Sequence, residues 1–117
     1  MRFVETDKVE LKEKNCDSLP KEIESFLNTE GGVLYIGIND DGDVVGVENI
    51  DSILRLISDI LSDQIEPNAI DCVRPEVEFI GSKAIIKINI KKGYSSLYCI
   101  KKYGFSSSGC HYRLANQ

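Results

Sequence analysis

The stretch that decides the fold is residues 28–42, which read NTEGGVLYIGINDDG. Gly31-Gly32 lets the backbone adopt positive φ and reverse sharply after a helix, because glycine has no Cβ to clash. The unbroken apolar run at 33–38 is typical of a strand covered on both faces. The residues at 39–42 predict a tight turn in which Asp41 and Gly42 take positive φ. We therefore expect a helix end, a central strand, and carboxylates placed at the end of that strand.

Length and composition predict one soluble globular domain. The chain has 117 residues, of which 42% are hydrophobic and 28% charged. The N-terminal residues contain no apolar segment of the kind that a secretory signal needs. No apolar run approaches the roughly 18 residues of a membrane-spanning helix. We therefore expect a cytoplasmic protein with no membrane partner.

The charges are divided unevenly along the chain, although the net charge is −5. Residues 1–81 hold all 19 acidic residues and seven basic ones, whereas residues 82–117 hold seven basic residues and no acid. Such a division can produce one basic face on an acidic molecule, which is a hint of nucleic-acid binding. A solvated lysine-rich hairpin explains it equally well. The basic residues of this segment are Lys83, Lys87, Lys91, Lys92, Lys101, Lys102 and Arg113.

Hydrophobic periodicity predicts two helices and several strands. One helix should begin at Asp17 or Ser18 and end within 28–31, and a second should run from Asp51 or Ser52 to Glu66-Pro67. Strands are expected at 8–12, 44–47, 77–80, 84–90 and 110–114. In the strand at 84–90 the isoleucines alternate with Lys83, Lys87 and Lys91, so the lysines should share one face.

Four residues of the first third could carry chemistry: Glu5, Glu10, Lys12 and Asp40. If the strand at 8–12 pairs near the central strand, two or three carboxylates could converge at one end of the sheet. A divalent cation relieves the repulsion between such carboxylates, and oxygen ligands favour Mg²⁺ or Mn²⁺. Such a cation could activate water against a phosphodiester, with Lys12 offsetting phosphate charge. From the residues alone, however, a solvated strand face and a simple turn are the favoured interpretation.

The chain resembles the Schlafen-type AlbA domain, which is also described as a divergent AlbA-like domain expected to bind DNA. The resemblance rests on Glu5-x4-Glu10-Leu11-Lys12 and on the block at 26–42, FLNTEGGVLYIGINDDG. Gly46, Ile65-x-Pro67 and Tyr112-Arg113 extend it over nearly the whole chain. It implies an α+β fold in which a small mixed β-sheet packs against two α-helices. We expect residues 1–117 to form one such domain, the N-terminal part of a longer protein.

The resemblance also implies a function, since bacterial members are commonly modules of transcriptional regulators. We expect a nucleic-acid-binding module, for DNA or RNA, that contacts phosphates through the seven basic residues named above, with Tyr103 or Tyr112 stacking on unpaired bases. The runner-up is an endoribonuclease, because animal Schlafen nucleases use three carboxylates here. By that likeness Glu5, Glu10 and Asp40 would hold Mg²⁺ or Mn²⁺, with Lys12 beside them. Those nucleases pair two lobes, and a homodimer could supply the second; a dimerisation or structural domain is the third interpretation.

Overall fold

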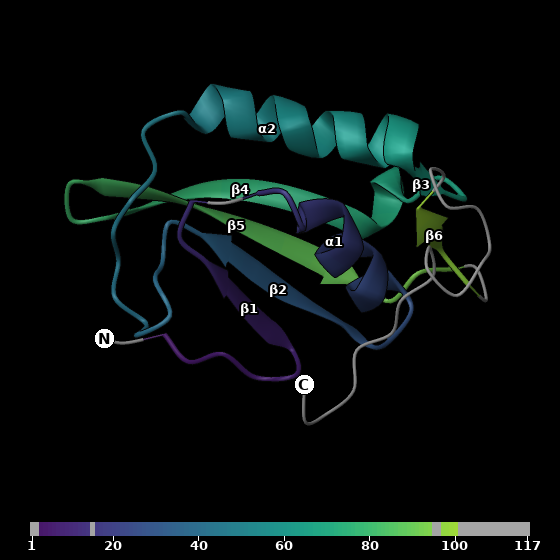
Figure 1. Cartoon of the computed structure of the whole chain (residues 1–117), viewed down its shortest axis with the longest axis horizontal. Helices are drawn as coiled ribbons and strands as arrows, with labels where there is room; N and C mark the ends of the chain where they lie inside the picture. The colour runs from purple at the N-terminus through teal and green to yellow at the C-terminus, as the bar shows by residue number, and fades with distance from the viewer. Residues whose placement is uncertain (1–2, 15, 95–96, 101–117) are drawn as a thin grey trace.

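The computed structural model describes residues 3–14, 16–94 and 97–100. Two helices and a four-stranded sheet form the body of the molecule, with a two-stranded sheet at one end (Figure 1). The helices are α1 (Leu19–Leu27) and α2 (Ile50–Asp59), the latter continued by a π-helical turn (Ile60–Gln64). The strands are β1 (Val9–Lys12), β2 (Gly31–Ile36), β3 (Ile65–Glu66), β4 (Val73–Ile80), β5 (Lys83–Lys91) and β6 (Cys99–Ile100). A short 3₁₀ turn (Ile70–Cys72) precedes β4.

The main sheet is mixed, with the strand order β1-β2-β5-β4. Strand β1 is parallel to β2, whereas β2 and β5, and β5 and β4, are antiparallel. Strands β3 and β6 form the second, antiparallel sheet. This arrangement confirms the expected α+β fold of a small mixed sheet packed against two helices.

Helix α1 forms where the sequence predicts it. Its N-cap residue is Ser18, and Pro20 lies in the first turn, where no intrahelical donor is needed. The apolar stripe of Leu19, Ile23 and Phe26 is fully buried. Helix α2 begins at Ile50, slightly before the expected start. The predicted end at Glu66-Pro67 was wrong, because the π-helical turn that continues α2 ends at Gln64 and Ile65–Glu66 pair with β6 as strand β3.

The core lies mainly between the helices and one face of the sheet. Helix residues pack there against Leu34 and Ile36 of β2 and against Ile86, Ile88 and Ile90 of β5. A smaller cluster around Leu11 and Ile85 lies on the opposite face and contains no helix residue. We call that opposite side of the sheet the helix-free face.

The two central glycines are required for different reasons. Gly31 has a φ of 80°, the left-handed conformation that glycine tolerates best, as expected for the reversal after α1. A Cβ on Gly32 would lie 2.4 Å from the Phe26 ring and 2.5 Å from the Lys8 carbonyl. Gly32 therefore lets helix α1 and the start of β1 approach the central strand closely.

Other local predictions were also wrong, and the central strand, expected at 33–38, is Gly31–Ile36. Residues 44–47 form no strand, because the amides of Val45 and Gly46 both donate to the Gly37 carbonyl, and only an Ile38–Val44 bridge remains. Asp41 does not take positive φ, since the turn needs only Gly42 (φ 85°) and the Asn39 side chain to close. Strand β4 starts at Val73, four residues before its expected start, because it pairs with β5 along its whole length.

The predicted strand at 110–114 lies outside the described residues. Within the part of the chain that the structure describes, no helix has the length and apolar character needed to cross a bilayer.

Candidate functional site

Lys12 lies under helix α1 and is not free to meet a substrate. Its Nζ lies 3.0 Å from Glu22 Oε1 and donates hydrogen bonds to Glu22 Oε2 (3.2 Å) and Ser18 Oγ (2.9 Å). The two charged side chains are only 13% and 16% exposed. Because residues two apart on a strand share a face, Glu10 lies on this same helix-covered side. The Lys12 end of the polar face expected for β1 is therefore covered by α1, whereas Lys8 at the other end is exposed.

Glu5 has a structural role at the outer edge of β1. Its Oε2 accepts a hydrogen bond from the Leu11 amide at 3.1 Å, while Thr6 and Val9 form a backbone bridge beside it. The side chain is otherwise exposed. Glu5 thus accepts the hydrogen bond of the Leu11 amide at the outer edge of β1. The Lys12 side chain instead lies on the face of the strand that is turned toward α1.

Asp40 lies in the turn that follows the central strand. The turn is organised by Asn39, whose side-chain oxygen accepts hydrogen bonds from the Asp41 and Asp43 amides at 3.0 and 2.9 Å. The Asp40 side chain is exposed. The Phe3 amide donates to the Gly42 carbonyl, so the N-terminal segment lies against this turn.

Glu5, Glu10 and Asp40 do not form a group of three that could hold a metal ion in the described structure. Within residues 3–14, 16–94 and 97–100, no group of three or more His, Cys, Asp or Glu side chains is arranged to hold a metal ion. The half-buried Cys16 nearby is no better placed for chemistry. Burial raises the pKa of its thiol, and Asp17 and Glu22 raise it further, whereas Lys12 lowers it. A raised pKa leaves little of the nucleophilic thiolate at neutral pH.

The predicted lysine row is present on β5. Ile86, Ile88 and Ile90 are buried under the helices, so Lys87 and Lys91 lie on the helix-free face, as the alternation predicts. Lys83 lies at the far end of the strand, where its Nζ donates to the Val44 carbonyl at 3.2 Å. Lys92 follows the strand and lies 4.0 Å from Glu30, with both side chains well exposed.

A shallow cavity of about 390 Å³ lies over β4 and β5, and Lys87 and Lys91 of this row line it. Sequence reasoning missed Arg74 and Asn89, which line it from neighbouring strands, because strand register decides which residues meet. Carboxylates line it as well, since Glu76 pairs with Lys87 across the strands and Asp71 lies nearby. The described part of this surface is thus of mixed charge rather than uniformly basic.

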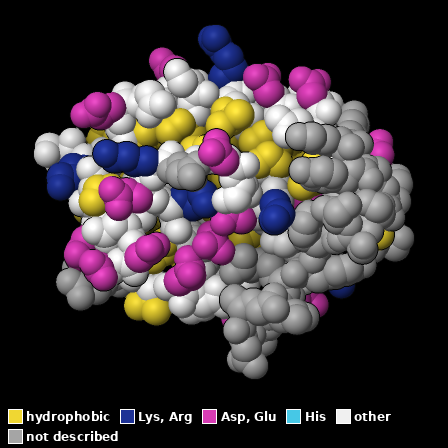
Figure 2. Space-filling model, in the orientation of Figure 1, with side chains coloured by type: hydrophobic (Ala, Val, Ile, Leu, Met, Phe, Trp, Pro, Cys, Tyr) yellow, Lys and Arg dark blue, Asp and Glu magenta, His cyan; other side chains and the backbone are white. Residues whose placement is uncertain are grey.

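The face shown in Figure 2 is also mixed, with Lys and Arg side chains interspersed among Asp and Glu. Tyr94, which follows Lys91 and Lys92, is 81% exposed. It is the described aromatic most open to a ligand, and sequence reasoning chose Tyr103 instead. Tyr103, Lys101, Lys102 and Arg113 lie outside the described residues.

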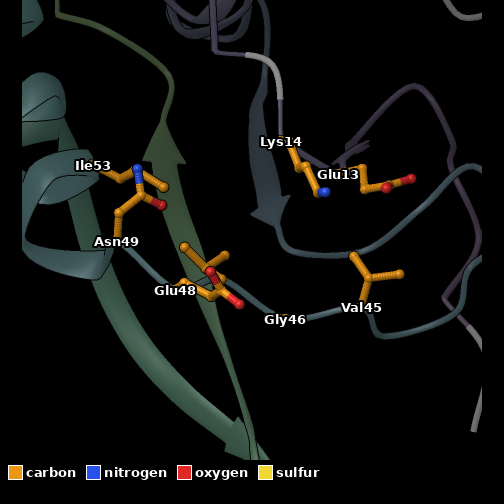
Figure 3. A pocket seen from close by; sticks show the side chains of 8 residues that line it. Glu13, Lys14, Val45, Gly46, Glu48, Asn49 and Ile53 are labelled. Atoms are coloured by element: carbon orange, nitrogen blue, oxygen red, sulfur yellow. The ribbon is translucent and has the colours of Figure 1, made fainter.

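A second cavity of about 450 Å³ lies between the end of β1 and the start of α2. In Figure 3 Glu13 and Lys14 line one side, and the loop at 45–49 and Ile53 line the other. Its charged side chains, Glu13, Lys14 and Glu48, are not among the predicted site residues. None of Glu5, Glu10, Lys12 and Asp40 lines it.

The fold and surface define a small α+β domain with a lysine-bearing strand on a helix-free sheet face. Over residues 5–117 the chain matches the family described as Schlafen, AlbA_2, and it therefore belongs to that family.

Two solved structures share the fold. One is the N-terminal domain of a protein from Nitrosomonas europaea named for its relation to the ATP-dependent DNA helicase RecG. It is 22% identical with a TM-score of 0.68, and the match covers 93% of this chain and 78% of that one. The other is the DIP2311 protein from Corynebacterium diphtheriae, 20% identical with a TM-score of 0.67. That match covers 95% of this chain but only 21% of the larger protein.

Proposed function

We propose that this chain is a nucleic-acid-binding module of a transcriptional regulator, and that it contacts phosphates through the basic residues of its C-terminal third. Membership of the Schlafen AlbA_2 family supports this, as does the fold shared with a RecG-related protein whose name refers to a DNA helicase. The module corresponds to residues 1–117 as one domain within a longer protein.

The observation that carries the proposal is the cavity over β4 and β5. Lys87 and Lys91 point to the side of the sheet opposite α1 and α2, and Arg74 lies beside them. Phosphate binding by such side chains gives affinity that falls with salt and depends little on sequence. Asp71 and Glu76 in the same cavity would repel a polyanion, so we expect modest affinity at physiological salt.

The test is fluorescence anisotropy of labelled single-stranded and duplex DNA, and of structured RNA, across a salt series. The variant K87A/K91A should lower the slope of log affinity against log salt by about 2, because each lysine that leaves a phosphate lowers it by about 1. The matched control K21A removes an exposed lysine on α1 and should leave the slope unchanged. Equal slopes for the unmodified chain and both variants would refute phosphate binding by Lys87 and Lys91.

Tyr94, which follows Lys91 and Lys92 in the chain and is largely exposed, provides a second expectation. Stacking of a base on an aromatic ring contributes about 1–3 kcal/mol by alanine substitution, so Y94A should weaken single-stranded binding roughly fivefold or more. Y94F should retain the affinity, because stacking does not need the hydroxyl. Duplex binding should be indifferent to both variants, since its bases are already stacked.

The endoribonuclease alternative, with Glu5, Glu10, Asp40 and Lys12 acting on RNA with Mg²⁺ or Mn²⁺, is tested in the same samples. Cleavage that requires Mn²⁺, stops in EDTA and is lost in Asp40→Ala would favour it over a binding module. The pairing of Lys12 with Glu22 and of Glu5 with the Leu11 amide makes this the weaker candidate.

A further inference from the structure

Strand β4 is an edge strand whose outer backbone groups can be identified from the register. The Val33 and Gly37 amides donate to β1, so the alternate residues of β2 bond to β5. Leu34 therefore bonds to Ile88, and the odd-numbered residues of β5 bond to the even-numbered residues of β4. The outward-facing residues of β4 are consequently Val73, Pro75, Val77 and Phe79.

No further strand pairs with these outward backbone groups within the described structure. The sheet ends at β4, and among the residues described no hydrogen bond reaches the amides of Val77 and Phe79. Pro75 lies where a missing N–H matters least, which is typical of an edge strand. The hairpin of β4 and β5 also extends beyond the other strands and the helices (Figure 1).

The side chains of β4 become more exposed toward the hairpin tip. Val73 is 6% exposed under the helices, Val77 is 38% exposed, and Phe79 is 71% exposed. Ile80 at the end of the strand is 40% exposed. An exposed apolar edge with free donors is a template for pairing with another strand.

The sequence of β4 shows which strand would fit. If two copies pair antiparallel with Glu76 on the two-fold axis, Arg74 of each faces Glu78 of the partner subunit. Val77 then faces Pro75 of the partner subunit, and the Val77 amide donates a hydrogen bond to that Pro75 carbonyl. We propose that this protein self-associates through β4, forming one continuous sheet across two copies.

The same geometry limits the strength of the dimer. Pro75 cannot return the hydrogen bond that it accepts from the partner's Val77, and Glu76 meets its own counterpart at the axis. Lys87, which pairs with Glu76 in register, offsets part of that repulsion. We therefore expect a reversible dimer rather than an obligate one. In that dimer the cavity over β4 and β5 of one copy and the same cavity of the partner would lie on one side of a shared sheet.

The test is sedimentation equilibrium of the full chain without nucleic acid, so its outcome does not depend on the proposed function. R74E and E78R should each weaken dimerisation about tenfold or more, because each turns both facing pairs into like charges. The double variant R74E/E78R should restore the dimer. Arg74 and Glu78 are about 13 Å apart along one strand, so only contact between copies can explain such a rescue.

K21E, an equal charge change on the exposed surface of α1, is the control and should dimerise as the unmodified chain does. The proposal is overturned if the unmodified chain remains monomeric at every concentration. It is overturned equally if single variants dimerise normally, or if the double variant is no better than the singles.

Discussion

Strands β1 and β4 lie at opposite edges of one sheet, but within the described residues only β1 has outer amides that the chain itself satisfies. Along β1, the Val9 amide donates to the Thr6 carbonyl and the Leu11 amide to the Glu5 carboxylate. Along β4, the amides of Val77 and Phe79 meet no partner within the described structure. The β1 edge has its donors satisfied by neighbours six residues away or fewer, whereas the described residues that protect the β4 edge are Pro75 and the charged side chains of the strand.

The difference indicates where this domain can interact. Proteins commonly cover or pair the backbone N–H and C=O groups of an edge strand, because unpaired groups can pair with another chain and cause aggregation. The β1 side is closed further by the Lys12–Glu22 pair, which ties the strand to α1. The β4 side carries the open edge, the exposed Phe79 and the cavity with Lys87 and Lys91. We therefore expect changes at β1 to affect stability and changes at β4 to affect association and binding.

The largest expected effect on the free energy of unfolding is at the β1 side of the sheet. E22A should lower the free energy of unfolding by about 2 kcal/mol, because it leaves the Lys12 ammonium largely buried without a counter-charge. Urea denaturation measures this. E30A, which removes the exposed partner of Lys92, is the control and should cost under about 0.5 kcal/mol. Equal costs for the two variants would show that the Lys12 pair does not hold β1 to α1.

A smaller effect is expected from Glu5. E5A should cost about 1 kcal/mol, the usual contribution of one hydrogen bond, because the Leu11 amide loses its acceptor. E5Q keeps an acceptor oxygen and should cost less, while E13A at the exposed end of β1 should be nearly neutral. If E5A lowers the free energy of unfolding no more than E13A does, the stability of the β1 edge does not depend on the hydrogen bond between Glu5 and the Leu11 amide.

The smallest effect on stability should come from the open side. F79A should change the free energy of unfolding by less than about 0.5 kcal/mol, since the ring is 71% exposed in one copy. V73A, on the same face of the same strand but buried, should cost about 1–2 kcal/mol. Urea denaturation at low protein concentration separates them. A large cost for F79A would mean that the tip of the hairpin is part of the core.

Local sequence patterns predicted most of the fold. The stripe of Leu19, Ile23 and Phe26, the glycine reversal at Gly31 and the alternation in β5 each depend on a few adjacent residues. The strand expected at 44–47 does not form, because the Gly37 carbonyl accepts hydrogen bonds from two successive amides of this segment. Hydrophobic periodicity cannot predict such a contact. The early start of β4 was missed for the same reason, since pairing with β5 stabilises residues whose own pattern is weak.

The candidate site was harder to predict, because it depends on which elements cover which face. Lys12 and Glu10 resemble a solvated strand face until α1 is placed over them. The side of the sheet on which Lys87 and Lys91 lie was predicted correctly, since alternation alone decides it, whereas their role in binding stays a prediction. Arg74 and Glu76 could not be placed beside them without the register of β4 against β5.

Amide hydrogen exchange, followed by NMR across a series of protein concentrations, compares the two edges most directly. The Leu11 amide should be protected at every concentration, because Glu5 and the chain itself cover it. The amides of Val77 and Phe79 should exchange quickly in dilute solution and become protected as concentration rises. Protection of Val77 and Phe79 that does not change with concentration, or a Leu11 amide that exchanges as fast as theirs, would contradict the account.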